Sequence, residues 1–159
     1  MSAKKYIERH VQKAEILTTT LDKNSKDAAK YICKMIDSFD KKYNSFCLLI
    51  GGETTVKVTG SGNGGRSSEL ALRLLDSGCI NEELTILCAG SDGIDGNSAA
   101  NGAFIDVTIL KNIKESKLNI KEYLQNSDSN SFFKKIGYEF KTGLSGTNVM
   151  DFVFVLKLK

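Results

Sequence analysis

Strand-like and helix-like segments alternate along this chain, and the alternation limits the folds open to it more than any single motif does. Apolar and β-branched residues dominate the expected strands, which are residues 14–21, 45–50, 54–60, 84–90 and 151–158. Helices are expected over residues 25–39, where apolar residues recur at helical spacing, and from 67 or 68 to 77. Further helical pieces are expected over 107–124, with Asn119 and Glu122 spaced like a capping box, and over 129–136. The pattern predicts an α/β fold, a layered domain in which a mixed β-sheet is flanked by helices.

Glycines indicate how two of these segments are joined and where one of them ends. The tripeptide at 51–53 separates the runs 45–50 and 54–60, which predicts one tight β-hairpin and therefore a sheet that is not purely parallel. Asn24 or Ser25 can cap the helix expected over 25–39. Ser67 or Ser68 can start the next helix, and Gly78 is placed to end it in the left-handed conformation.

Length and charge favour one globular domain that does not bind nucleic acid. The chain has 159 residues and no obvious linker, so we expect a single domain over 1–159. Within it, residues 1–44 form a helix–strand–helix portion and residues 45–159 form a motif-bearing core. The net charge is only +3 and the lysines are scattered among acidic residues, which gives no basic patch for nucleic acid.

The cysteines and the apolar runs indicate a cytoplasmic protein without a zinc site. The four cysteines include no C-x-x-C pair, and the single histidine, His10, lies far from them in the sequence. The amino terminus lacks the apolar region of a signal peptide, and no stretch approaches eighteen apolar residues, so neither export nor membrane spanning is expected. We therefore expect reduced cysteines.

The first candidate loop is the glycine-rich stretch at 60–66, which leads into a predicted helix. Unpaired amides at a helix start favour anions, and glycines allow a ligand to approach the backbone closely. Arg66 is a cation at a helix start, where the dipole mildly repels it, so an anion is expected to visit it. The alternative is a structural turn, because the formal G-x-G-x-x-G lacks the context of a dinucleotide fold.

The second candidate loop follows the expected buried strand at 84–90. Asp92 and Asp95 lie just beyond the carboxyl end of that strand, which is the usual ligand position in open α/β sheets. Their carboxylates could hold a cation, orient a hydroxyl or accept its proton. The alternative is that they form Asx turns with the neighbouring glycines.

The third candidate loop, at 141–151, carries small hydrogen-bonding side chains. Thr142, Ser145, Thr147 and Asn148 could bind phosphate oxygens or sugar-like hydroxyls. Each of them could equally be an ordinary turn residue.

Together and in this order, the three loops resemble the MOFRL domain, the carboxyl-terminal part of class II glycerate 2-kinases. The resemblance rests on GGETTVKVTGSGNGGRSSELAL (51–72), AGSDGIDGNSAANGAFID (89–106) and TGLSGTNVMDFVFVL (142–156). It implies ATP-dependent phosphorylation of glycerate to 2-phosphoglycerate, in a cleft shared with a larger Rossmann-like amino-terminal domain. Family members have also been labelled hydroxypyruvate reductases, although this sequence lacks a nicotinamide-binding fingerprint.

The resemblance also implies roles for the loop residues. Arg66 would bind the glycerate carboxylate or the transferring phosphoryl group. It would act together with three backbone amides, those of Gly64, Gly65 and Ser67. Asp92 or Asp95 would orient the 2-hydroxyl or a magnesium-bound water. Thr147 and Asn148 would line the same pocket.

These implications leave three functions open. The chain could be one part of a glycerate kinase, inactive alone, with ATP and magnesium used by the complete enzyme and no cofactor bound tightly here. It could instead be a free-standing module that binds a small anion, or a docking protein. The expected partner is an amino-terminal kinase half, or a second copy through an uncovered apolar face.

Overall fold

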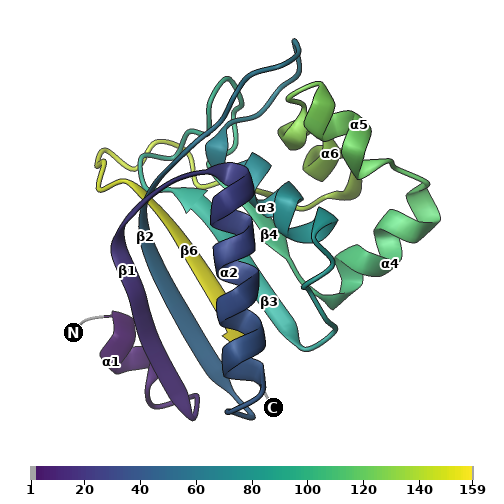
Figure 1. Cartoon of the computed structure of the whole chain (residues 1–159). Helices are drawn as coiled ribbons and strands as arrows, with labels where there is room; N and C mark the ends of the chain where they lie inside the picture. The colour runs from purple at the N-terminus through teal and green to yellow at the C-terminus, as the bar shows by residue number, and fades with distance from the viewer. Residues whose placement is uncertain (1–2, 159) are drawn as a thin grey trace.

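The computed structural model describes residues 3–158 as one mixed sheet with helices packed on it (Figure 1). The strands are β1 (Lys13–Asn24), β2 (Phe46–Thr55), β3 (Leu84–Gly90), β4 (Gly102–Ile105), β5 (Glu139–Phe140) and β6 (Asp151–Lys157). The helices are α1 (Ala3–Ile7), α2 (Ser25–Asp40), α3 (Arg66–Asp76), α4 (Val107–Ser116), α5 (Ile120–Gln125) and α6 (Ser129–Ile136). The expected layered α/β fold is confirmed.

The order of strands across the sheet is β1-β2-β6-β3-β4-β5, so the last strand of the chain lies in the middle. β1 and β2 are parallel, whereas β6 is antiparallel to both of its neighbours, β2 and β3. This insertion brings the start of β6 next to the end of β3. The second and third candidate loops therefore meet at one edge of the sheet.

The prediction of a tight hairpin at residues 51–53 is wrong, because β2 continues through Gly51 and Gly52. Gly51 pairs with Phe152 and Gly52 pairs with Asp151, both on β6. A side chain on Gly52 would collide with the backbone of Leu21 on β1, and its φ of +136° is one that side-chain-bearing residues rarely adopt. Gly52 therefore allows β2 to pack closely against β1, and neither glycine forms a turn.

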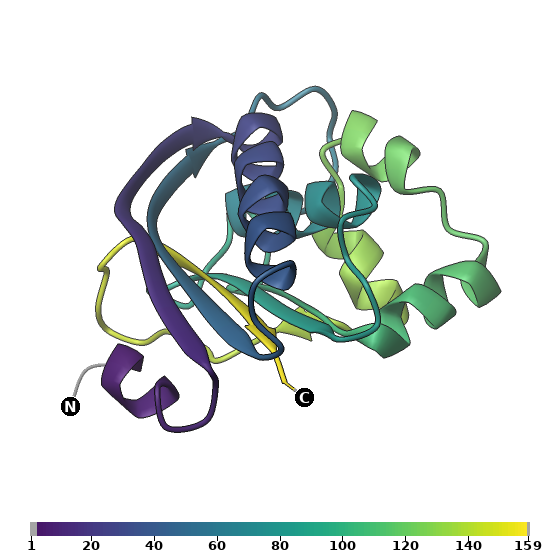
Figure 2. The same ribbon diagram turned by 60° about the horizontal axis from the view of Figure 1, so that its bottom comes forward.

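The main core lies between one face of the sheet and the helices α2, α3 and α6 (Figures 1 and 2). β2 contributes Phe46, Leu48 and Ile50 to this face, as expected from the alternation of side chains along a strand. The alternate positions Cys47 and Leu49 point to the opposite face, where α1 packs over a second, smaller cluster. Both faces of β2 are buried, which explains its continuous apolar run.

The ends of most helices agree with the sequence predictions. Asn24 caps α2 by accepting from the amide of Asp27, and Gly78 follows α3 in the left-handed conformation with a φ of +69°. The helical pieces expected over 107–124 are the two helices α4 and α5, because Lys117 adopts a φ of +55° and ends α4 and Asn119 caps α5. β4 and β5 were not predicted, because segments of four and two residues carry too little periodicity.

The expectation of four reduced cysteines is also wrong, because Cys33 and Cys79 form a disulfide. Because α2 packs beside α3, the Cα atoms of Cys33 and Cys79 lie 5.6 Å apart, although the two cysteines are 46 positions apart in the sequence. Cys47 and Cys88 are free and buried, as expected of small core residues. None of the helices within residues 3–158 combines the length and apolarity that a membrane span needs.

Candidate functional site

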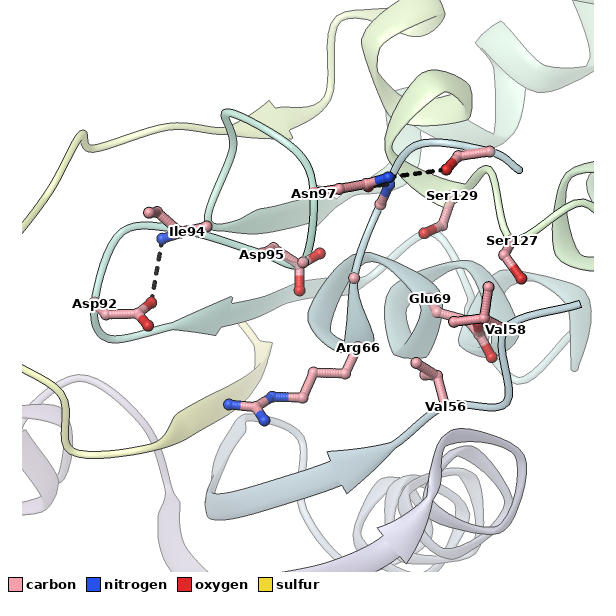
Figure 3. A pocket seen from close by; sticks show the side chains of 14 residues that line it. Val56, Val58, Arg66, Glu69, Asp92, Ile94, Asp95, Asn97, Ser127 and Ser129 are labelled. Atoms are coloured by element: carbon pink, nitrogen blue, oxygen red, sulfur yellow. Dashed lines mark hydrogen bonds between the residues drawn. The ribbon is translucent and has the colours of Figure 1, made fainter. Parts of the chain in front are cut away.

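A cavity of about 530 Å³ lies at the start of α3, where the first two candidate loops meet (Figure 3). Arg66 and Glu69 line it from α3, and Asp92 and Asp95 line it from the loop after β3. Residues that follow β2, glycines of the first loop, Ser127 before α6 and Ser129 at the start of α6 also line it. The cavity therefore brings together Arg66 and both predicted carboxylates.

The glycine-rich loop packs against other parts of the protein and does not form an open binding loop for an anion. The amide of Gly62 donates to the carbonyl of Asn126 at 2.9 Å, and the amide of Asn63 donates to Asp128 Oδ1 at 2.7 Å. A Cβ atom added to Gly60 or Gly62 would collide with the backbone of residues 126–128. These glycines are explained by contact with the segment that joins α5 to α6.

Asp95 caps the start of α3 from another loop. Its Oδ1 accepts from the amide of Ser67 at 2.8 Å, and its Oδ2 accepts from the amide of Ser68 at 2.9 Å and from the Ser68 hydroxyl at 2.5 Å. The side chain is buried, and the residue is only 2% exposed. A carboxylate thus already occupies the anion-binding position at this helix start.

The expectation that the amides of Gly64, Gly65 and Ser67 are free to bind a ligand is corrected, because each of them donates to an acceptor within the protein. The amide of Ser67 donates to Asp95, that of Gly64 to Asn97 Oδ1 at 2.8 Å, and that of Gly65 to Ser68 Oγ at 3.2 Å. Because each donor is already used within the protein, Arg66 is the group at the helix start that retains capacity for an anion.

Arg66 is held by two carboxylates. Its Nε donates to Asp151 Oδ2 at 2.6 Å, and its Nη2 donates to Asp151 Oδ1 at 3.2 Å and to Glu53 Oε1 at 3.1 Å. The side chain of Asp151 is 14% exposed, whereas that of Glu53 is 48% exposed. No hydrogen bond from residues 3–158 engages Nη1 of Arg66, so this nitrogen can still donate to a ligand in the cavity.

These contacts shift the pKa values of both partners in the ion pair. Hydrogen bonding to Asp151 raises the pKa of Arg66, so the guanidinium stays charged. Burial raises the pKa of the Asp151 carboxyl, and the neighbouring Arg66 opposes this shift without cancelling it. The arginine is therefore a fixed cation whose counter-charge is itself costly to bury.

Asp92 differs from Asp95 in having an unused oxygen. Its Oδ1 accepts from the amide of Ile94 at 3.1 Å, which is the Asx turn that the sequence left open. Its Oδ2 receives no hydrogen bond from the described part of the chain. Asp92 therefore combines a local structural contact with a free acceptor at the cavity wall.

The third loop contacts the second loop but does not enter the cavity. Ser145 donates through its hydroxyl to the carbonyl of Ser91 at 2.5 Å, and the Ser91 hydroxyl accepts from the amide of Val149 at 2.8 Å. Thr147 and Asn148 are exposed and are not among the residues that line the cavity. This loop meets the site residues in two places: the amide of Ser145 donates to the carbonyl of Asp92 at 3.1 Å, and Asp151, its last residue, pairs with Arg66.

Glu69 is a site residue that sequence reasoning missed. It lies one turn after Arg66 on α3, is 4% exposed, and lines the cavity. Its Oε1 accepts from the Ser25 hydroxyl at 2.7 Å and from Arg73 Nε at 2.9 Å. The signal in the sequence was the spacing of Glu69 and Arg73, which places two opposite charges one turn apart on the same helix face.

A preformed metal centre is not a feature of this site. Within residues 3–158, no group of three or more histidine, cysteine, aspartate or glutamate side chains is arranged to hold a metal ion. Asp92 could supply a single carboxylate ligand through Oδ2. One or two protein carboxylates are enough for Mg²⁺ where substrate phosphates and water complete its shell.

Comparison with known protein families and sequences gives consistent matches. A model of the MOFRL family matches residues 46–151. The chain is 38% identical over 148 residues to the D-glycerate 2-kinase of Thermotoga maritima, which covers 90% of this chain and 35% of that protein. It is 34% identical over 149 residues to the glycerate 2-kinase of Pyrococcus horikoshii, which covers 91% of this chain and 34% of the relative. The chain thus spans about a third of the length of these relatives.

Solved structures give the same result for the fold. The crystal structure of a glycerate kinase from Thermotoga maritima superposes on 98% of this chain with a TM-score of 0.88 and 35% identity, and the match covers 39% of that chain. A protein from Pyrococcus horikoshii superposes equally well, with a TM-score of 0.88 and 30% identity over 98% of this chain and 37% of its own.

Proposed function

This chain belongs to the MOFRL family, and from that premise we propose that it forms one wall of the active site of a glycerate 2-kinase. The complete enzyme transfers a phosphoryl group from ATP to the 2-hydroxyl of glycerate. The remaining walls come from a part of the enzyme that corresponds to the other two-thirds of the relatives. The partner is that larger part, or a second copy of the chain that completes the site. We place this chemistry in the cytoplasm, where ATP is supplied.

The observation that carries the proposal is the setting of Arg66 in the cavity wall. Asp151 and Glu53 fix the direction of the guanidinium, and Nη1 remains free to donate. Phosphoryl transfer needs alignment and positive charge more than covalent help from the protein. We propose that Arg66 binds an anion there, either the glycerate carboxylate or the migrating phosphoryl group.

The ion pairs also limit how strongly Arg66 can attract an anion. Two carboxylates already neutralise the guanidinium, so an incoming anion competes with them. Glu53 is the weaker competitor, because its exposed side chain can turn to solvent without leaving a buried charge unpaired. We propose that a ligand displaces Glu53 and leaves Asp151 in place.

Asp92 is the carboxylate best placed to act on the substrate side of this reaction. We propose that its free Oδ2 orients the glycerate 2-hydroxyl or contributes one ligand to Mg²⁺. Bound magnesium would supply charge neutralisation at the nucleotide phosphates. Asp95 has a structural role in this proposal, because both of its oxygens hold the start of α3. Thr147 and Asn148 lie outside the cavity, and this proposal assigns them no contact with the substrate.

A chimeric enzyme tests this function. Residues 1–159 would replace the matching third of the Thermotoga maritima D-glycerate 2-kinase, to which the chain is 38% identical over 148 residues. We expect the chimera to form 2-phosphoglycerate from ATP and D-glycerate, detected by phosphorus NMR. A chimera that folds and binds nucleotide but transfers no phosphoryl group to glycerate would argue against the proposal.

A further inference from the structure

Glu69 is a buried carboxylate with only one of its two oxygens engaged. Oε1 accepts from the hydroxyl of Ser25 and from the guanidinium of Arg73, whose Nη2 lies 2.8 Å away. The side chain is 5% exposed. No hydrogen bond from residues 3–158 reaches Oε2, so the second oxygen of this buried charge has no protein partner.

The free oxygen of Glu69 remains accessible from the cavity. Glu69 lines the cavity, and Oε2 is not among the fully buried polar atoms that lack a partner. Figure 3 shows the side chain extending toward Val56 and Val58, away from the direction taken by Arg66. A carboxylate oxygen accepts hydrogen bonds, and the guanidinium of Arg73 engages Oε1 and leaves Oε2 without a donor. The position thus calls for a hydrogen-bond donor from a ligand.

The geometry points to Glu69 Oε2 as the acceptor of an alcohol hydroxyl on the bound ligand. This inference rests on the proposed kinase function, in which an anionic group of the ligand lies near Arg66. The cavity then has a cationic end at Arg66 and an acceptor end at Glu69, where Val56 and Val58 supply apolar surface. A ligand that carries both an anionic group and a hydroxyl matches these two ends.

Two components of a kinase reaction carry that combination. The hydroxy acid has a carboxylate and hydroxyls within three carbons, whereas the nucleotide has phosphates and ribose hydroxyls further apart. The volume of about 530 Å³ is in the range of clefts that hold ligands larger than glycerate. Both ligands present the same chemistry to Glu69, so the experiment must distinguish them.

Matched pairs of ligands test the inference on the wild-type chain. Amide NMR spectra would follow titration with D-glycerate against propionate, and with ADP against 2′,3′-dideoxy-ADP. We expect the hydroxylated member of one pair to bind about tenfold or more tightly, since a hydrogen bond to a charged group commonly gives that ratio. The pair that shows the preference identifies the source of the hydroxyl.

The variant Glu69→Gln tests whether this residue causes the preference. The amide oxygen can keep the contacts to Ser25 and Arg73, while an NH₂ group replaces the free acceptor. We expect the hydroxylated and deoxy ligands to bind this variant within about threefold of each other. Glu115→Gln, a change on the exposed face of α4, is the control and should keep the wild-type preference.

The outcomes separate this inference from the proposed function. If all four ligands bind the wild-type chain at Arg66 without preference for a hydroxyl, the role of Glu69 is overturned and anion binding stands. A preference that survives in Glu69→Gln overturns it as well. If no ligand perturbs the amides of residues 64–69, both the role of Glu69 and anion binding by this chain are overturned.

Discussion

Arg66 and Asp151 are joined by two hydrogen bonds, Nε to Oδ2 at 2.6 Å and Nη2 to Oδ1 at 3.2 Å, across a sequence separation of 85 residues. The pair ties the start of α3 to the start of β6, and so ties the first sequence motif to the third. Asp151 reaches this position because β6 is inserted in the middle of the sheet, next to β2 and β3. The order of the strands, rather than any local motif, orients the arginine.

Removing the exposed partner of Arg66 should strengthen anion binding. In Glu53→Gln one negative charge no longer competes for the guanidinium, whereas the buried contact to Asp151 is unchanged. We expect the affinity for phosphate, measured by amide NMR, to rise about two- to fivefold at low ionic strength. Glu115→Gln, remote from the cavity, should leave it unchanged. Weaker binding in Glu53→Gln would mean that Glu53 helps to hold the anion instead of competing with it.

Removing the Asp95 cap should destabilise the fold. Asp95→Ala leaves the amides of Ser67 and Ser68 without an acceptor in a buried region, which we expect to cost about 3 kcal/mol. Chemical denaturation of the two proteins would measure this difference. Asp76→Ala, an exposed change at the other end of the same helix, should alter stability by less than about 0.5 kcal/mol. Equal stability of the two variants would show that the cap is dispensable.

A side chain at Gly65 in the glycine-rich loop should lower the stability of the fold. In Gly65→Ala the new methyl group would collide with backbone atoms of Asp95 and Gly96 and with the Asp95 carboxylate. We expect a loss of about 1–3 kcal/mol in the free energy of unfolding. Gly51→Ala is the matched control, because its methyl would meet only ordinary contacts at 3.6 Å or more. A well-tolerated Gly65→Ala would show that the loop is looser than described.

Reduction of the disulfide should lower stability without changing the fold. The bond between Cys33 and Cys79 closes a loop of 46 residues, and a cross-link of this kind commonly contributes about 2–4 kcal/mol. Dithiothreitol should therefore lower the melting temperature of the wild-type chain but not that of Cys33→Ser. Cys47 and Cys88 should resist alkylation in the folded protein, since burial raises the pKa of Cys47 to about 11 and that of Cys88 further. A wild-type melting temperature that does not respond to reductant would contradict the bond.

Much of the fold could be predicted from the sequence, because its longer elements carry strong periodicity. α2, α3 and β3 lie within a residue or two of the predicted segments, and the caps at Asn24 and Gly78 were readable from residue type. The hairpin at 51–53 failed because paired glycines indicate a turn and a close strand contact equally well. Which one applies depends on β1 and β6, which are distant in the sequence.

The candidate site was predictable as a set of loops but not as a set of contacts. Proximity of Arg66, Asp92 and Asp95 was implied by the resemblance to the MOFRL domain, and the cavity brings these residues together. Their different bonding did not follow, because it depends on which carboxylate meets the start of α3 and which meets the guanidinium. The disulfide and the anchoring of Glu69 by Ser25 likewise arise from the packing of α2 beside α3, which no local pattern encodes.

The turnover of Arg66→Ala in the chimera with the Thermotoga maritima D-glycerate 2-kinase tests the central claim most directly. The account predicts that kcat for glycerate phosphorylation falls about 10³-fold while the chimera keeps its fold, because the transition state loses its cationic partner. Arg9→Ala, which removes an exposed arginine outside the cavity, should retain full turnover. Turnover of Arg66→Ala within a few-fold of the unsubstituted chimera would contradict the account.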